Sequence, residues 1–258
     1  MKRLISEGLA KARNAKRFWV CTWILIGLSL LQVLLNYAID KHSPSFSESK
    51  SDVSSVIFGM LGNQSLFMAI VPAMFVVRDF TQNTVRNKII CGHSRTSIYF
   101  AHLICFDAVA MFYHIVATLS SLIFGLALLG GADSLAHGYV AYYCVHSVLL
   151  ILAYASMTMF ICVLIRGVSG AIIAYVINTL LSTFGAIAMI ALRNHEKLVD
   201  LIRCAVLDMQ TTELLTGIES PGEYPSMFLR VAMPLFALSY IIALPIIGVR
   251  IFNKTDLK

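Results

Sequence analysis

Long apolar runs, separated by short polar connections, constrain this chain more than any other feature of its sequence. Six runs can each form a helix of about 20 residues or more, the length that crosses a bilayer. They cover residues 18–39, 56–77, 97–129, 139–165, 171–192 and 229–249. Only 13% of the residues are charged, against roughly 25% in soluble domains. The sequence therefore predicts one all-α transmembrane domain over residues 1–258, with six membrane-spanning helices.

The positive charges sort the polar segments by side of the membrane. With a cytoplasmic N-terminus, the inner segments hold fourteen of the 20 Lys and Arg residues, and ten of the 14 acidic residues lie in outer segments. This bias predicts that both termini are cytoplasmic, as an even number of spans requires. The net charge of +6 forms no stripe, so a nucleic-acid partner is not expected.

Two segments outside the spans also have helical patterns. Residues 1–17 combine six cations with Leu4, Ile5, Leu9 and Ala12, which predicts an amphipathic helix in the headgroup plane that contacts membrane lipid. Residues 193–228 form the longest outer segment. Its apolar residues follow a helical period, which predicts an extracellular helix on or in the outer leaflet: Leu198, Leu201, Ile202, Ala205 and Met209.

A basic loop at residues 78–96 separates the second span from the third. Within it, Thr81 to Ile90 reads as a short helix with Val85, Ile89 and Ile90 on one face, and Gly92 is placed to end it. The third span is about 50 Å long at 1.5 Å per residue, so its first turns should project beyond the bilayer beside this helix. A solvated loop that only sets orientation is the simpler alternative. The mixture of apolar and hydrogen-bonding residues favours a docking helix.

Several chemistries lack their sequence motifs. The chain has no G-x-x-x-x-G-K-[ST] phosphate loop, and His195-Glu196 is followed by Val at position 199, where a zinc protease needs His. The six cysteines include no C-x-x-C pair. We therefore predict no catalytic residue, no metal site and no cofactor bound by this chain. Asp107 is the one carboxylate inside an apolar run and a possible intramembrane polar site, although the interpretation we favour is pairing with a neighbouring helix or a location near the headgroups.

The layout and the loop together resemble the permease subunits of ATP-binding cassette (ABC) exporters of the second, six-helix class. That pattern has an acidic residue, a Thr, a basic or polar helix, then Gly-x-Ser-Arg before a Tyr-bearing span. This chain matches it at Asp79, Thr84, Arg86, Asn87, Gly92, Ser94, Arg95 and Tyr99, and the tail Phe252 to Lys258 is also similar. Asn83 departs from the pattern, because relatives commonly have Gly there.

The resemblance implies a transport subunit that is not itself an enzyme. Two copies of a cytoplasmic ABC ATPase subunit, which bind ATP and Mg, would contact the coupling loop 78–96, including Val85 and Ile89. A second permease chain, identical or related, would complete the pathway in a bacterial plasma membrane. The apolar composition suggests an amphipathic or hydrophobic substrate such as a peptide, an antibiotic or a lipid-like molecule. The alternatives are an intramembrane enzyme acting on lipid or peptide, and a membrane sensor or anchor that transports nothing.

Overall fold

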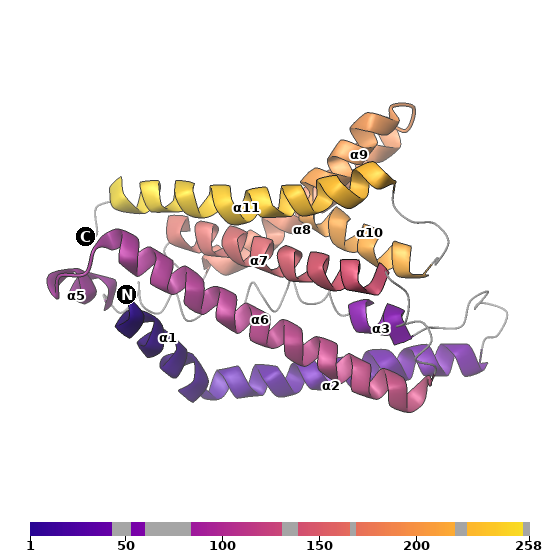
Figure 1. Ribbon diagram of the computed structural model, residues 1–258, viewed down its shortest axis with the longest axis horizontal. Helices are drawn as coiled ribbons and strands as arrows, with labels where there is room; N and C mark the ends of the chain where they lie inside the picture. Colours follow the sequence, from indigo (N-terminus) through magenta and orange to yellow (C-terminus); the bar gives the residue numbers. More distant parts are fainter. Residues whose placement is uncertain (43–52, 60–83, 131–138, 166–168, 220–225, 255–258) are drawn as a thin grey trace.

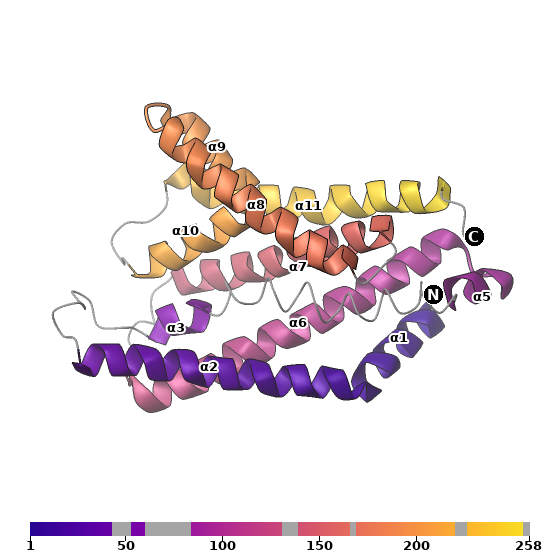
Figure 2. The ribbon, with the colours of Figure 1, turned by 180° about the vertical axis from the view of Figure 1, so that it is seen from behind.

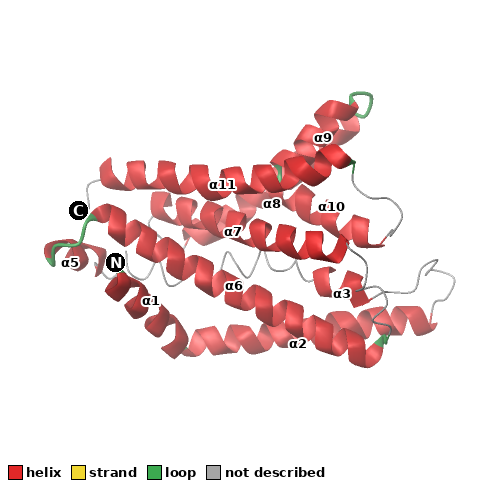
Figure 3. Ribbon diagram, in the orientation of Figure 1, coloured by secondary structure: helices red, strands yellow, loops and turns green. Residues whose placement is uncertain are grey.

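The protein is helical throughout the part of the chain that the structure describes (Figures 1 and 3). This computed structural model describes residues 1–42, 53–59, 84–130, 139–165, 169–219 and 226–254. Its helices are α1 (Lys2–Asn14), α2 (Lys16–His42), α3 (Val53–Gly59), α5 (Thr84–Ile90), α6 (Arg95–Leu128), α7 (Tyr139–Ile165), α8 (Ser169–Ala191), α9 (Glu196–Ala205), α10 (Leu207–Glu219) and α11 (Met227–Lys254).

Five of these helices are long and apolar enough to cross a membrane: α2, α6, α7, α8 and α11. Each begins and ends within a few residues of a span predicted from the sequence, except that α11 continues five residues beyond 249. The remaining predicted span, 56–77, is described only as far as Gly59, where α3 ends, and its other residues lie outside the described part. The membrane-protein character expected from composition is therefore supported by five helices of the required length and apolarity.

Helix α6 is the axis of the bundle. It packs against α1, α2, α3, α7 and α11, and Figures 1 and 2 show it crossing between α2 and α7. Two buried polar contacts fix α2 on it: Tyr113 Oη donates to the Phe18 carbonyl at 3.1 Å, and Ser120 Oγ donates to Ser29 Oγ at 2.9 Å. Such hydrogen bonds cannot be exchanged for water inside an apolar bundle, so they set the register of the two helices.

Helix α7 forms the second half of the core, since it packs against α6, α8, α10 and α11. Ser147 Oγ lies 3.2 Å from His114 Nε2 of α6, and both side chains are buried. At the other side of α7, Tyr142 Oη donates to the Arg230 carbonyl of α11 at 3.1 Å. The two long helices α6 and α7 thus connect every other span in the described part of the chain.

The two segments outside the spans are helical in most of their described residues, and their location relative to the membrane stays a prediction. Helix α1 buries Leu4 and Ala12, and Cys105 Sγ of α6 lies 3.5 Å from the Ile5 carbonyl, so the apolar face of α1 rests on protein. The outer segment is two helices, because the chain leaves helical geometry at Val206 (φ −97°, ψ 118°) between α9 and α10. The predicted breakers Pro221, Gly222 and Pro225 lie outside the described residues.

The elements divide between the two ends of the bundle. The N-terminus, α5 and the C-terminal end of α11 lie together at one end, and α9 lies toward the other (Figure 1). The cytoplasmic location of this end and the even number of crossings stay predictions made from charge.

Candidate functional site

The coupling loop is a short helix seated on the bundle by one side. In α5, Val85 is only 2% exposed and Ile89 packs partly buried against the core. Ile90, predicted for the same face, is 74% exposed. The reason is geometric: five residues advance the helix by about 500°, which turns Ile90 well away from Val85. The described part of the predicted helix, from Thr84, ends at Ile90 as expected, and residues 81–83 and Asp79 lie outside the described part.

Gly92 ends α5 as the sequence predicted. Its φ of +86° is in the left-handed region that a side chain disfavours. The Gly92 N–H donates to the Ile89 carbonyl at 2.9 Å, and the His93 N–H donates to the Lys88 carbonyl at 3.2 Å. This pair of bonds is the Schellman arrangement, which satisfies the last carbonyls of a helix and reverses the chain.

Ser94 then begins the longest helix of the protein. Its Oγ accepts from the Ser97 N–H at 3.2 Å, so Ser94 is the N-cap of α6. Only four residues, 91–94, separate α5 from α6. With a defined turn on one side and a cap on the other, α5 is held at a fixed angle to α6. A displacement of α5 would therefore reach α6 directly.

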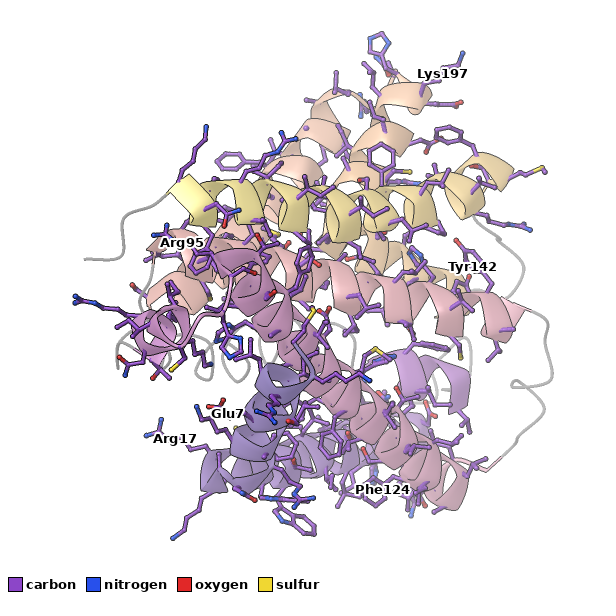
Figure 4. All side chains as sticks on the ribbon, turned by 60° about the vertical axis from the view of Figure 1, so that its left-hand side comes forward. Glu7, Arg17, Arg95, Phe124, Tyr142 and Lys197 are labelled. Carbon is purple, nitrogen blue, oxygen red and sulfur yellow. The ribbon has the colours of Figure 1, made fainter. Side chains whose placement is uncertain are left out.

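The first turns of α6 are also joined to the last turn of α11. Arg95 Nη1 donates to the Asn253 carbonyl at 3.0 Å, and Asn253 Nδ2 donates to Thr96 Oγ1 at 3.3 Å. Deeper in the bundle, the ring centroids of Tyr99 and Phe252 are 6.2 Å apart. Figure 4 shows Arg95 beside the end of α11. Apart from the resemblance of the tail, no sequence pattern indicates this junction, because it joins residues about 160 positions apart.

The surface that α5 offers to a partner is both basic and apolar. Arg86, Asn87 and Ile90 are exposed, at relative positions i, i+1 and i+4 on the side opposite Val85, and Cys91 is exposed in the turn that follows. Arg is enriched at protein–protein interfaces, and an exposed apolar side chain beside it could add buried area to such a contact. The residues that hold α5 and the residues available for contact are thus different sets.

Asp107 lies in α6 about 18 Å along the helix from Arg95, at 1.5 Å per residue. Among the described residues, its buried Oδ1 atom has no hydrogen-bond partner, and the same holds for the hydroxyl of Tyr99, two turns earlier. The neighbouring histidines are engaged elsewhere: His102 Nδ1 lies 2.8 Å from the Ile98 carbonyl, and His114 Nε2 contacts Ser147. Pairing of Asp107 with a neighbouring helix, which the sequence left open, is not seen for this oxygen among the described residues.

A second polar cluster joins the outer helices to the bundle, and the sequence did not reveal it. Asp208 Oδ1, in the first turn of α10, accepts from Tyr154 Oη of α7 at 2.5 Å and from Asn178 Nδ2 of α8 at 2.8 Å. Tyr154 and Asn178 are each 5% exposed. Asn178 interrupts an apolar run, which is the only signal in the sequence that could have pointed to this cluster.

Neither cluster has the composition of a metal centre. Within the described residues, no group of three or more His, Cys, Asp or Glu side chains is arranged to hold a metal ion. The site that combines an exposed recognition surface with rigid attachment to the bundle is the α5 corner. No protein-family model and no curated protein sequence matches this chain.

Proposed function

We propose that this chain is the membrane permease subunit of an ATP-driven ABC exporter. The observation that carries the proposal is the attachment of α5: Val85 and the Gly92 turn hold it on the start of α6, while Arg86, Asn87 and Ile90 face outward. A helix that is fixed to a long spanning helix and open on its outer face is suited to receive force from another protein. The absence of a phosphate loop in this sequence is in keeping with a separate ATPase subunit.

The mechanism follows from the rigidity of the corner. Closure of two ATPase subunits on ATP and Mg would displace α5. Because Arg95 and Asn253 join α6 to α11, the displacement would move the ends of both helices together as a rigid body. Two permease chains, identical or related, would form the pathway between them. The substrate class that we propose is an amphipathic or hydrophobic molecule, a peptide, antibiotic or lipid-like compound, since the spans are predominantly apolar.

The proposal is tested by purifying the tagged chain from native membranes. We expect an ATPase subunit with a phosphate loop to co-purify, and ATP hydrolysis to accompany it. Arg86→Glu and Ile90→Asp should each reduce recovery of that subunit, because an interface hot spot contributes about 2 kcal/mol or more, or roughly thirtyfold in affinity. Arg250→Glu makes the same charge change on an exposed residue at the same end of the molecule, and should leave recovery unchanged.

The alternatives predict different results. A sensor or anchor would bind the ATPase, yet reconstituted vesicles would show no ATP-dependent movement of an amphipathic substrate. An intramembrane enzyme would act on lipid or peptide with no ATPase present. Equal ATPase recovery from Arg86→Glu, Ile90→Asp and native protein would contradict the docking role of α5.

A further inference from the structure

The corner between α1 and α2 carries positive charge that the fold does not use. Arg13, Lys16 and Arg17 are all exposed, and none of them pairs with a carboxylate of the described residues. The one acidic residue before Asp40 is Glu7, whose Oε1 lies 2.6 Å from Lys11 Nζ. Figure 4 shows Arg17 projecting away from the bundle. Three cations within five residues thus have no carboxylate partner in the described part of the chain.

The apolar side of α1 is not available to balance this charge by entering the bilayer. Leu4 and Ala12, 5% and 4% exposed, are buried as α1 packs against α6. Lys2, Arg3 and Arg13 lie on the opposite side of α1 by helical geometry. What α1 presents outward therefore combines these cations with Leu9, which is 37% exposed, and the cations give it an electrostatic attraction to a membrane.

The charges of the corner stand at the boundary of the bilayer. Helix α2, which crosses the membrane, begins at Lys16. Trp19 and Trp23 follow within two turns, and their side chains are 48% and 70% exposed on the bundle surface. Tryptophan is enriched at the headgroup level of membranes. Trp19 Nε1 also donates to the Arg13 carbonyl at 2.9 Å, which fixes the angle between α1 and α2.

We infer that Arg13, Lys16 and Arg17 form a binding site for anionic phospholipid headgroups, with Trp19 and Trp23 about 5 and 10 Å further along α2. Each cation at a membrane surface contributes about 1 kcal/mol of attraction to acidic lipid, and the attraction fades over a Debye length of roughly 10 Å. Helix α1 leads away from the corner along α6 (Figure 2), so Lys2 and Arg3, roughly 15 Å or more along the helix from Arg13, belong to the site less strongly.

The chain carries its own reporter for this site. Trp19 and Trp23 are the only two tryptophans in the sequence, so the intrinsic tryptophan fluorescence of the full-length protein originates at the corner. The experiment reconstitutes the protein in phosphatidylcholine–phosphatidylglycerol vesicles in which either lipid is brominated, at one fixed composition. Bromine quenches tryptophan fluorescence at short range. The ratio of quenching by brominated phosphatidylglycerol to quenching by brominated phosphatidylcholine, corrected for mole fraction, therefore measures the enrichment of phosphatidylglycerol around the two tryptophans.

We expect native protein to show an enrichment of about threefold or more near 0.1 M salt, where the Debye length is roughly 10 Å, falling toward one near 1 M salt, where it is roughly 3 Å. The variant Arg13→Gln/Lys16→Gln/Arg17→Gln should show a ratio close to one. Lys2→Gln/Arg3→Gln, the control on the far part of α1, should retain most of the enrichment. Circular dichroism and elution volume confirm that each variant is folded. A ratio of one in native protein, or an unchanged ratio in the triple variant, overturns the inference.

Discussion

At the scale of single residues, the closest approach between α6 and α11 depends on Gly248. A Cβ atom at this position would overlap the Tyr99 hydroxyl and come within 2.8 Å of Tyr99 Cζ. Tyr99 is 1% exposed and its ring has no open space to enter. A side chain of any size at position 248 must therefore push the two helices apart at the junction that carries Arg95 and Asn253.

We predict that Gly248→Ala destabilises the protein by about 1–3 kcal/mol, the usual cost of overpacking. Tyr99→Phe should have little effect alone, because the hydroxyl that it removes has no hydrogen-bond partner. Combined with Gly248→Ala, it should recover part of the loss, since the most severe overlap is removed. The apparent melting temperature of detergent-purified variants measures the loss of stability and its recovery. A double variant whose loss equals the sum of the single losses would contradict the proposed contact.

At the scale of elements, one carboxylate joins the outer helix α10 to two spans. Asp208 accepts from buried Tyr154 and Asn178, which come from two different spans. Asp208→Leu would leave both donors without an acceptor, at a cost of about 1–3 kcal/mol for each unsatisfied group. Asp208→Asn keeps a carbonyl oxygen in place. We predict faster hydrogen exchange in α10 for the Leu variant, with α6 unchanged, and near-native exchange for the Asn variant.

Two other patterns of hydrogen exchange would contradict the role that we assign to Asp208 as an acceptor. Equal exchange rates in native, Leu and Asn proteins would show that α10 is held by apolar packing alone. An Asn variant that exchanges as fast as the Leu variant would show that the negative charge, and not the acceptor, is required.

Local sequence patterns predict the positions of the helices better than the breaks and contacts between them. Span positions followed from apolar length, because each membrane crossing needs about the same number of residues. The stop at Gly92 followed from the left-handed backbone that glycine favours. The break at Val206 could not be predicted, since no Gly or Pro marks it and the apolar period continues through it. The pairing of Asp208 with Asn178 depends on how α8 and α10 pack, which no local pattern records.

At the scale of the whole molecule, the proposed function requires α5 to face the cytoplasm. Cys91 tests this directly, because its thiol is exposed in the turn after α5. Cys21 and Cys105 are partly buried in the spanning helices α2 and α6, and a Cys91→Ser variant measures any labelling of them. Cys144 is exposed but belongs to the spanning helix α7, and it can be replaced by Ser. Burial raises the pKa of the Cys204 thiol to about 11, so near neutral pH it remains protonated and unreactive.

We predict that a membrane-impermeant maleimide labels Cys91 in the Cys144→Ser background only after cells are permeabilised. The reason is the charge bias that places the N-terminus, the α5 loop and the end of α11 on the cytoplasmic side. Lys197→Cys, at the opposite end of the bundle (Figure 4), serves as the matched control when combined with Cys91→Ser and Cys144→Ser. It should label in intact cells. Labelling of Cys91 in intact cells would place α5 outside, where no cytoplasmic ATPase could reach Arg86 or Ile90, and the proposed export mechanism would fail with it.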